Sequence, residues 1–478
     1  MKAGRRKSLL APPASSALYT YLSMSYAAAI DQLNALAPEL YARPGQPRRK
    51  FSLDEFRTLL AALGNPHQRF RSVLIAGTNG KGSTVATLAS ILTASGARAG
   101  LYTSPHLQRV NERIRIGDAE IPDDAFASLF FLVHDAAQRL MHDHRLPQHP
   151  SFFEHLTAMA FLYFAEQNVD LAVLEVGMGG RLDATNVIDP LLSIITDISL
   201  DHTEWLGSTI TAIAREKAGI LRQGGTLITL PQLPEANQVL NEAAAAHGVH
   251  MIDASHFLPP SGETGPYLVK AFGASVKIDS SLAGAHQKRN IALAIAAAVE
   301  ITEADYELFF PPGKRGIFAS PGSIARGIRN TRWPGRLERI ERDGTVWVLD
   351  VAHNPAGARA VCSGLTSLLG EMRPRCLIFS CLRDKPIAEM AHILFPLFER
   401  VILTPLHAAR AASIEDLVAA AQLAQTPFFV AQSVAEAVQL ARNHAGGQPI
   451  VITGSVYLVG EARSLLLAER AESGGRIE

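Results

Sequence analysis

The sequence predicts an α/β protein built on two mostly parallel sheets, one in a larger N-terminal domain and one in a smaller, Rossmann-like C-terminal domain. Short, apolar, β-branched segments alternate with helical patterns from residue 72 to residue 230, and the same alternation returns beyond residue 332. Alternation of this kind is typical of βαβ units. At 478 residues the chain is also longer than one hydrophobic core usually supports.

The N-terminal domain is expected over residues 24–330, and its first helix is predicted at Tyr26–Leu36. Its strands are predicted at Ser72–Ala76, Ala99–Thr103, Asp170–Glu175, Leu192–Asp197 and Thr226–Thr229. Further helices are predicted at Val85–Ser95, Ser151–Gln167 and His286–Ile301, and a small antiparallel pair at Tyr267–Phe272 and Val276–Asp279. Residues 1–23 are expected to be a flexible extension or a misassigned start, because their apolar stretch is short and broken by prolines.

The C-terminal domain is expected over residues 331–478, after a proline- and glycine-rich stretch at 311–330 that is predicted to be a linker or loop. Its strands are predicted at Thr345–Val351, Arg375–Ser380, Arg400–Thr404, Phe428–Val430 and Pro449–Thr453. Ligands of open parallel sheets bind beyond the carboxyl ends of the strands. The active site is therefore expected in a cleft between the two domains.

The composition argues against several classes of function. Lys plus Arg equal Asp plus Glu at 45 each, so no basic excess favours nucleic acid. No apolar run approaches the length needed to span a bilayer. Cys362, Cys376 and Cys381 are too few for a disulfide framework and lack metal-ligand spacing, which favours buried thiols in a reducing compartment. We expect a cytoplasmic monomer.

A phosphate-binding loop is predicted between the first strand and the helix that follows it. Gly77, Gly80 and Gly82 surround Lys81, and the hydroxyl of Ser83 follows just before the predicted helix. Backbone N–H groups and a helix N-terminus directed at one point suit a polyphosphate, and the lysine adds a point charge. Compared with the Walker pattern, the spacing before the Gly-Lys pair is shorter, and Gly82 separates the lysine from the hydroxyl. A purely structural turn is the alternative.

Three polar residues fall at or just after the ends of predicted strands: Ser104, Glu175 and His202. If these strands neighbour the strand of the phosphate loop, all three side chains converge on the nucleotide phosphates. Mg²⁺ prefers oxygen ligands and takes one or two of them from protein, whereas imidazole is a less usual ligand for it. Each residue also has a structural alternative, respectively a turn before proline, an ion-paired strand end and a hydrogen-bonded histidine.

Two further features follow the same strands. The glycine-rich stretch 177–186 carries Arg181 and Asp183, which are able to orient a polar substrate; a solvated loop is the alternative. Lys217 lies in a predicted helix, where a solvated surface lysine is the common case. A partly desolvated lysine near a metal has a lowered pKa and reacts with CO₂ to give a carbamate, an anion that binds a second cation. The spacing does not decide between the two.

The C-terminal half contributes Arg336, in Pro-Gly-Arg, and the pair Asp350 and His353 at a strand end. Arg336 is a plausible cation for the transition state of phosphoryl transfer, because its charge does not titrate. Asp350 is able to accept hydrogen bonds from a ribose or from a donor residue. For His353 a structural role is an equal alternative.

Taken together, these motifs resemble the folylpolyglutamate synthase/dihydrofolate synthase family of the Mur ligase superfamily. The resemblance covers nearly everything from Met24 onward, apart from 305–330, and rests on motifs in order. The motifs are GTNGKGS (77–83), YTSPHL (102–107), SFFE (151–154), LEVGMGGRLDATN (174–186), LDHTEWLG (200–207), REKAGI (215–220), GAHQKRN (284–290), PGR (334–336) and DVAHNP (350–355).

The resemblance implies a role for each matching residue. It implies ATP binding by Thr78, Asn79, Gly80, Lys81, Ser83, Asn290, Arg336 and Asp350, with His353 near the reacting phosphate. It implies Mg²⁺ coordination by Ser104, Glu175 and His202, and a carbamate on Lys217 that organises a second Mg²⁺. It implies pteroate contacts by Ser151, Phe152, Phe153, Glu154, Leu182, Asp183 and Ala184. Serine at position 151 departs from the threonine expected there, which weakens the dihydrofolate synthase half.

The implied reaction is ATP-dependent amide formation. A folate or dihydropteroate carboxylate takes the γ-phosphoryl group of ATP, and the amine of L-glutamate then displaces phosphate from the acyl phosphate. Lys81, Lys217, Arg336 and His353 are the catalytic candidates. The alternatives are a folylpolyglutamate synthase without dihydrofolate synthase activity, a Mur-type cell-wall ligase, a regulatory NTPase and an inactive binding module. No separate nucleotide-sugar domain precedes the phosphate loop, which argues against the cell-wall ligase.

Overall fold

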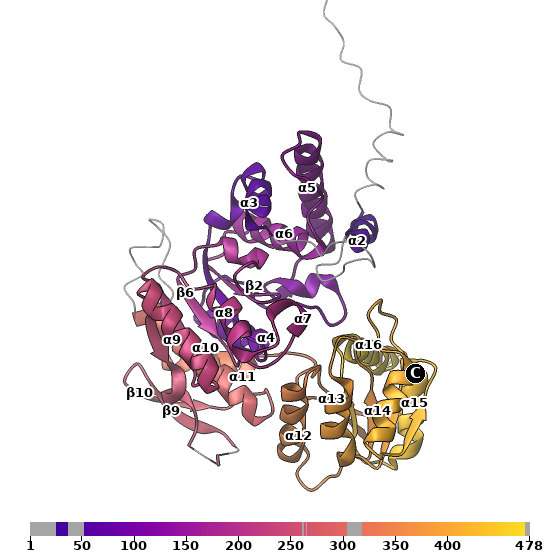
Figure 1. The fold of residues 1–478 in the computed structure, drawn as a ribbon. Helices are drawn as coiled ribbons and strands as arrows, with labels where there is room; N and C mark the ends of the chain where they lie inside the picture. Colours follow the sequence, from indigo (N-terminus) through magenta and orange to yellow (C-terminus); the bar gives the residue numbers. More distant parts are fainter. Residues whose placement is uncertain (1–24, 37–51, 261, 264, 304–317, 474–478) are drawn as a thin grey trace, which may run out of the picture. The chain divides into compact units, whose positions relative to one another are not determined.

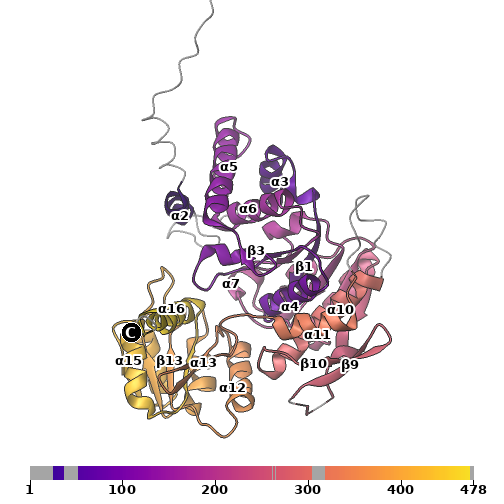
Figure 2. The same cartoon turned by 180° about the vertical axis from the view of Figure 1, so that it is seen from behind.

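The computed structural model describes residues 25–36, 52–260, 262–263, 265–303 and 318–473. The predicted extension at residues 1–23 and the first part of the predicted loop, residues 311–317, lie outside these ranges. The chain forms two compact units, residues 1–67 with 121–167, and residues 68–120 with 168–478. Figures 1 and 2 show the elements of each unit from opposite sides.

The first unit is helical in its described part. Its helices are α2 (Tyr26–Ala35), α3 (Leu53–Ala62), α5 (Asp123–His142) and α6 (Phe152–Glu166). Aromatic side chains join them: the rings of Tyr26 and Phe126 meet edge-on at 5.5 Å, and Phe56 lies 6.5 Å from Phe161. Phe126 and Phe161 are fully buried, so the unit has its own apolar interior.

The second unit contains an eight-stranded sheet with the strand order β4-β3-β2-β5-β1-β6-β7-β8. The strands are β1 (Arg71–Ala76), β2 (Ala99–Tyr102), β3 (Ile114–Ile116), β4 (Ala119–Glu120), β5 (Leu171–Glu175), β6 (Leu192–Ile195), β7 (Thr226–Thr229) and β8 (His250–Asp253). All neighbouring pairs from β2 to β8 are parallel, and only β3 and β4 add antiparallel pairs at one edge. The predicted parallel sheet is confirmed, and β3, β4 and β8 are additions to it.

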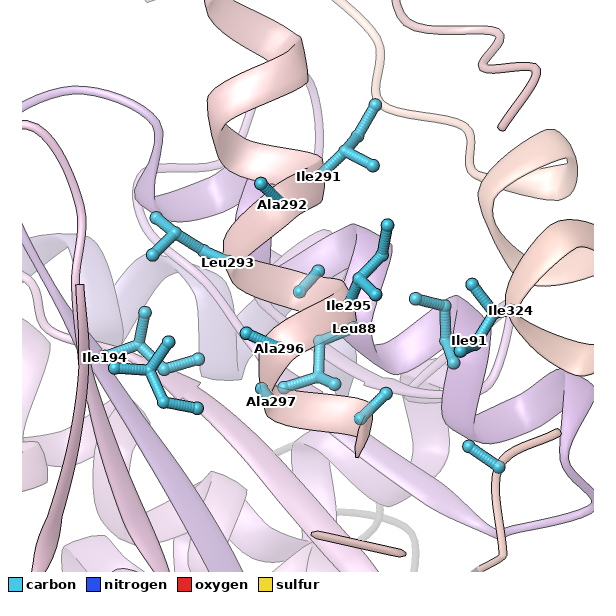
Figure 3. Close-up of a cluster of buried hydrophobic side chains, with 14 of the residues drawn as sticks. Leu88, Ile91, Ile194, Ile291, Ala292, Leu293, Ile295, Ala296, Ala297 and Ile324 are labelled. Carbon is cyan, nitrogen blue, oxygen red and sulfur yellow. The ribbon is translucent and has the colours of Figure 1, made fainter. Parts of the chain in front are cut away.

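The helices of this part are α4 (Lys81–Ala94), α7 (Thr203–Leu206), α8 (Ile210–Ala218), α9 (Pro234–His247), α10 (Ala285–Glu303) and α11 (Pro321–Asn330). Figure 3 shows Ile295 of α10 close to Leu88 of α4, and Ile291 and Ile91 belong to the same buried core. The hairpin predicted after α9 is present as β9 (Tyr267–Ala271) and β10 (Ala274–Ile278), which pair antiparallel. Both views place this hairpin beside α11.

The prediction of a loop through residue 330 is wrong from Pro321 onward, where α11 begins. Ser320 caps this helix by accepting a hydrogen bond from Ser323 N, and Pro321 stands at the first position, where no backbone donor is needed. Ile324 and Ile328 are fully buried on one face. The proline of this stretch therefore starts a helix, and its glycines are compatible with one. The helical spacing of the apolar residues was hard to recognise in the sequence because prolines and glycines are frequent around it.

The C-terminal part of the second unit is a six-stranded sheet with the order β11-β12-β16-β13-β14-β15. Its strands are β11 (Glu338–Arg342), β12 (Thr345–Leu349), β13 (Cys376–Phe379), β14 (Arg400–Leu403), β15 (Phe428–Val430) and β16 (Ile450–Thr453). All pairs are parallel except β11 with β12. Its helices are α12 (Pro355–Leu369), α13 (Ile387–Leu394), α14 (Ile414–Leu423), α15 (Val434–Ala445) and α16 (Val456–Ser473).

Two sequence-based expectations about the whole chain bear on the fold. Cys376 and Cys381 are buried, Cys362 is partly buried, and all three are free thiols. No helix among the described residues combines the length and apolar character that crossing a membrane requires.

Candidate active site

Four neighbouring strands bring the predicted phosphate and metal residues to one edge of the eight-stranded sheet. Ser104 follows β2, and Glu175 is the last residue of its neighbour β5. The loop at 77–80 follows β1, and the segment 197–202 follows β6. All four run parallel, so their carboxyl ends lie at the same edge. The condition on which the predicted convergence depends, that these strands be neighbours, is met.

The phosphate loop leaves the N-terminus of α4 open. Gly80 is the residue before the helix, its φ is +90°, and no side chain caps the first turn. The first intrahelical bond runs from Thr84 N to the carbonyl of Gly80, so the N–H groups of the first turn are directed out of the helix. Asn290 lies against this turn, because a Cβ placed on Gly80 would stand 2.1 Å from its Oδ1. Glycine is therefore required here twice, by conformation and by space.

Two lysines share one carbonyl of the phosphate loop. Lys217 Nζ donates a hydrogen bond to the carbonyl oxygen of Gly77 at 2.7 Å, and Lys81 Nζ donates to the same oxygen at 3.2 Å. Lys217 is only 3% exposed, so the structure rejects the solvated-lysine alternative. Burial and the charge of Lys81 lower the pKa of Lys217 to about 7. Lys81 and the protonated form of Lys217 thus place positive charge beside the phosphate loop, which suits an anion.

Glu175 faces the same charges. Its Oε2 accepts a hydrogen bond from the backbone N–H of Ser104 at 3.1 Å, which brings two predicted metal ligands together. Burial raises the pKa of Glu175, and Lys81, the Ser104 N–H and Arg336 oppose that rise. The Glu175 carboxylate therefore interacts electrostatically with Lys81 of the phosphate loop and with Arg336 of the C-terminal part.

The donor set fits a magnesium ion that is shared with phosphate oxygens. Among the described residues, no three histidine, cysteine, aspartate or glutamate side chains group closely enough to hold a metal alone. Glu175 and the Ser104 hydroxyl would supply oxygen, the element that Mg²⁺ prefers, and phosphates and water would complete the shell. His202 lies just before α7 with φ +50°, and burial lowers its pKa to about 3, so its imidazole is neutral and able to act as a ligand.

The loop after Glu175 is braced from within by Asp183. Its Oδ1 accepts hydrogen bonds from the backbone N–H and hydroxyl of Thr185, at 3.0 and 2.5 Å, and its Oδ2 accepts one from Met178 N at 3.0 Å. Arg181 is exposed and pairs with Glu216 at 2.9 Å. Asp183 thus holds the shape of the loop, and its predicted contact with pteroate, like those of Leu182 and Ala184, stays a prediction.

Two carboxylates, Asp350 and Glu175, act electrostatically on Arg336. Asp350, at the end of β12, is 6% exposed and accepts hydrogen bonds from Leu337 N at 2.9 Å and Ala352 N at 2.8 Å. Burial lowers the pKa of Arg336, while Asp350 and Glu175 raise it, which places the guanidinium within reach of both. The predicted nucleotide residue of the C-terminal part and the predicted metal carboxylate therefore act on the same cation.

Sequence reasoning missed an ionic cluster around Asp201. Lys385 Nζ lies 2.7 Å from Asp201 Oδ1, and both side chains are less than 10% exposed. Asn354 Nδ2 donates to Asp201 Oδ2 at 3.1 Å and to Asn79 Oδ1 at 3.0 Å, and His353 Nε2 lies 3.4 Å from Asp201 Oδ2. Despite burial, His353, His202 and Lys385 hold the pKa of Asp201 well below its usual range. Lys385 follows the carboxyl end of β13, and that position was a usable signal.

The remaining predicted nucleotide residues support the loop. Thr78 N donates to the carbonyl of Asp197, and the Thr78 hydroxyl donates to that of Ser199 at 3.0 Å. Asn79 Nδ2 donates to Ser199 Oγ at 3.0 Å. Ser83 is 1% exposed inside the first turn of α4. These contacts fix the loop to the segment that follows β6.

Ser151 and Glu154 form a capping box at the start of α6. Glu154 Oε2 accepts hydrogen bonds from Ser151 N at 2.7 Å and Ser151 Oγ at 2.9 Å, and Ser151 Oγ accepts one from Glu154 N. The Ser-x-x-Glu spacing was readable as this motif from the sequence. The predicted pteroate contacts of Ser151, Phe152, Phe153 and Glu154 stay predictions beside this structural role.

Known proteins resemble both halves of this arrangement. Residues 75–298 match the Mur ligase middle domain, and residues 335–456 match the Mur ligase glutamate ligase domain. The folylpolyglutamate synthase of Lacticaseibacillus casei is 37% identical over 87% of this chain and 94% of its own length. The dihydrofolate synthase/folylpolyglutamate synthase of Bacillus subtilis is 33% identical over 87% of this chain and 95% of its own.

Solved structures agree with the sequence comparisons. The Mycobacterium tuberculosis folylpolyglutamate synthase complexed with ADP superposes with a TM-score of 0.80, at 31% identity, over 95% of this chain and 99% of its own. An FPGS–AMPPCP–folate complex superposes with a TM-score of 0.77, at 33% identity, over 93% of this chain and all of its own. On the shared motifs, the two matching domains and relatives covered nearly end to end, the chain belongs to the folylpolyglutamate synthase family of Mur ligases.

Proposed function

We propose that this chain is an ATP-dependent ligase that joins the amino group of L-glutamate to a carboxylate of a folate, releasing ADP and phosphate. The observation that carries the proposal is the pair of lysines on the Gly77 carbonyl, at the open N-terminus of α4 and within electrostatic reach of Glu175. Relatives named folylpolyglutamate synthase and dihydrofolate synthase/folylpolyglutamate synthase supply the substrate class.

A carboxylate must be activated before an amine attacks it, and the site suits activation by phosphorylation. Lys81 and the open N–H groups of the first turn of α4 bind the transferred phosphate, and Arg336 stabilises the negative charge that builds up as the phosphoryl group moves. The folate carboxylate becomes an acyl phosphate. The glutamate amine then attacks the acyl carbon, and the C–O bond to phosphate breaks as the amide forms. These residues contribute positioning and charge stabilisation.

We further propose that the reaction uses Mg²⁺, held by Ser104, Glu175 and His202 together with nucleotide phosphates. The ion would neutralise phosphate charge as a Lewis acid. The Glu175→Ala variant is expected to lose activity by about 100-fold, in line with loss of charge stabilisation at the transition state. A titration of activity with Mg²⁺ checks the assignment. Near-normal activity of this variant at saturating Mg²⁺ would contradict it.

We also propose that Lys217 carries a carbamate. Lys217 is buried and its pKa is lowered to about 7, so a neutral amine is present to attack CO₂. The modification would replace the positive charge of Lys217 beside Lys81 with the negative charge of a carbamate. The new carboxylate oxygens would be available to a second Mg²⁺. A mass increase on the peptide that contains Lys217, with acid-labile behaviour, tests this modification directly.

The finer assignments are proposals of the same kind. We propose a domain boundary near residue 331, a monomer that acts in the cytoplasm, and dihydrofolate synthase activity beside folylpolyglutamate synthase activity. Gel filtration tests the monomer. Parallel assays with dihydropteroate and tetrahydrofolate test the second activity, and turnover with tetrahydrofolate alone would limit the chain to folylpolyglutamate synthesis.

One assay separates the ligase from a regulatory NTPase. Phosphate release from ATP is measured with tetrahydrofolate or dihydropteroate, each with and without L-glutamate. The ligase predicts release that depends on both the acceptor and glutamate, together with a product extended by one glutamate. ATP turnover that is insensitive to both substrates would reject the proposal and favour the NTPase.

A further inference from the structure

The segment that leads to Arg336 lies along the helix of the phosphate loop. α11 packs against α4 so closely that a Cβ on Gly327 would stand 2.5 Å from Ile91 Cα. Ser90 Oγ donates a hydrogen bond to the carbonyl of Gly327 at 2.7 Å, and Figure 3 shows Ile324 of α11 beside Ile91 of α4. α11 is therefore held to the helix that carries Lys81.

Beyond α11, the indole of Trp333 covers the phosphate loop at Gly82. A Cβ on Gly82 would stand 3.0 Å from Trp333 Nε1 and 3.1 Å from Cζ2. Gly82 is not among the residues with positive φ, so its backbone accepts any side chain. Gly80, by contrast, has φ +90°. The third glycine of the loop is thus explained by the neighbouring indole and not by its own conformation.

After Trp333, at Gly335 and Leu337, the same segment is fixed to the residues that follow β12. Val351 N donates to the carbonyl of Gly335 at 3.0 Å, and Leu337 N donates to Asp350 Oδ2 at 2.9 Å. Gly335 has φ +70°, and a Cβ there would stand 3.0 Å from Val351 Cγ1. The backbone on both sides of Arg336 is therefore anchored. Before it, the Trp333 indole packs on Gly82 of the phosphate loop, and around it, backbone hydrogen bonds join the segment to Asp350 and Val351.

We propose that Trp333 is a positioning residue for phosphoryl transfer, which sets the place of the Arg336 guanidinium relative to the phosphate loop through its contact with Gly82. The inference rests on the proposed ligase function. Arg336 serves the transition state more than bound ATP, so a shift of its position lowers kcat more than it raises the KM for ATP. A side chain that only filled space would change stability instead.

A double-mutant cycle at the contact tests the proposal. Gly82→Ala places a methyl group against the indole, and Trp333→Phe removes the part of the ring that meets it. We expect G82A to lower kcat by about 30-fold and W333F by about tenfold, values typical of misplaced catalytic groups. The double variant should then resemble W333F alone, because the smaller ring leaves room for the methyl group. The thermal midpoint should change little in W333F.

Two outcomes overturn the proposal. One is a double variant whose loss in kcat equals the product of the single losses, since this would show that the two positions act independently. The other is a W333F enzyme whose kcat stays within twofold of wild type. The affinity for ADP, measured by calorimetry, should change less than kcat in both single variants, because Arg336 acts mainly on the transition state. If the wild-type chain shows no ligase activity, the proposed function fails, while the same cycle measured on thermal stability still tests the contact between positions 82 and 333.

Trp347 provides a matched control. Like Trp333, it has a buried Nε1 without a hydrogen-bond partner among the described residues. An arginine also lies over each ring, Arg115 at 5.7 Å from the Trp333 centroid and Arg442 at 5.6 Å from that of Trp347. Trp347 is fully buried and packs in the core of the C-terminal sheet. W347F should lower stability with kcat within twofold of wild type. A tenfold loss of kcat in W347F would show that any tryptophan replacement has this effect.

Discussion

Two helices of this protein begin after the carboxyl end of a parallel strand, and their first turns are built in opposite ways. α4 begins after Gly80, which offers no side chain to cap the helix. α12 begins after Asn354, whose Oδ1 accepts a hydrogen bond from Gly357 N at 2.8 Å. Pro355, the first residue of α12, has no N–H at all. The same strand-turn-helix connection therefore leaves one helix open to an anion and closes the other.

The difference shows what turns a common connection into a phosphate site. A helix N-terminus attracts anions through its unpaired N–H groups and the dipole of the helix. In α12 the side chain of Asn354 already occupies this position, and its amide links the turn to Asn79 and Asp201. In α4 the position is kept free by glycine, and two lysines gather beside it. Each of the following variants changes one of these features.

The largest effect is expected from Lys81→Ala, which removes the charge from the open helix. We expect the glutamate-dependent rate to fall by about 1,000-fold, the upper range for loss of one stabilising group at a transition state. Lys270→Ala is the matched control, because Lys270 is an exposed lysine on β9. Phosphate release in both variants provides the measurement. A loss of less than tenfold in K81A would mean that the helix and the remaining cations suffice.

A smaller effect is expected from Lys217→Ala, about 100-fold, because it removes the proposed carbamate but leaves the loop and Lys81 in place. The carbamate also predicts a dependence on pH. With a pKa lowered to about 7, the Lys217 amine is mostly protonated at pH 6 and cannot attack CO₂, whereas at pH 8 it is mostly neutral. Added bicarbonate should therefore activate the wild type more strongly at pH 8 than at pH 6, and should leave K217A unchanged.

Equal activation of K217A by bicarbonate would show that the activation does not come from Lys217.

The Lys217→Ala variant also predicts a change in the pH dependence of stability. The unfolded lysine, with a pKa of 10.5, binds more protons than the folded one between pH 7 and 10.5, so wild-type stability should rise with pH across that range relative to K217A. Thermal unfolding of both proteins at pH 6.5 and 9 checks this sign.

The open turn of α4 was predictable from the sequence, whereas the contacts that complete the site were not. An apolar strand followed by three glycines and a lysine is a local pattern. Lys217 meets the Gly77 carbonyl across 140 residues of sequence, and Lys385 meets Asp201 across 184 residues. Contacts between residues so far apart in the sequence depend on the order of the strands in the sheet. The hydrophobic periodicity of a single strand does not determine that order. The family resemblance indicated Lys217, whereas Lys385 was missed although it follows the carboxyl end of β13.

A local pattern failed at α11, for a physical reason. α11 contains Pro321, Gly322 and Gly327, residues that argue against a helix, yet the proline stands at the first position and Gly327 allows α4 to approach. Tertiary packing decided this case. The capping box of Ser151 and Glu154 was also present in the sequence as a short-range hydrogen-bond motif, and it leaves the pteroate contacts predicted for the same residues as predictions.

A moderate effect is expected from Gly80→Ala, which tests whether the open turn depends on glycine. Alanine at φ +90° is strained by about 1–2 kcal/mol, and its Cβ would stand 2.1 Å from Asn290 Oδ1. We expect the affinity for ADP, measured by calorimetry, to fall at least tenfold. Gly344→Ala is the matched control, because Gly344 has φ +71° with no atom within 4 Å of its Cβ position. Both variants should lose stability, but only G80A should lose ADP affinity.

The smallest effect is expected at the closed helix. Asn354→Ala removes the cap of α12, which costs about 1 kcal/mol of unfolding free energy. It also removes two hydrogen bonds, to Asn79 Oδ1 and Asp201 Oδ2, worth about 1 kcal/mol each. Ser413→Ala removes interactions that serve α14 alone, since Ser413 Oγ accepts from Asp416 N and donates to Asp416 Oδ2 at the exposed start of that helix. Denaturant unfolding should therefore show a loss in N354A about two to three times that in S413A. Equal losses would mean that the amide of Asn354 serves α12 alone, and that the closed helix is not tied to the phosphate loop through Asn79.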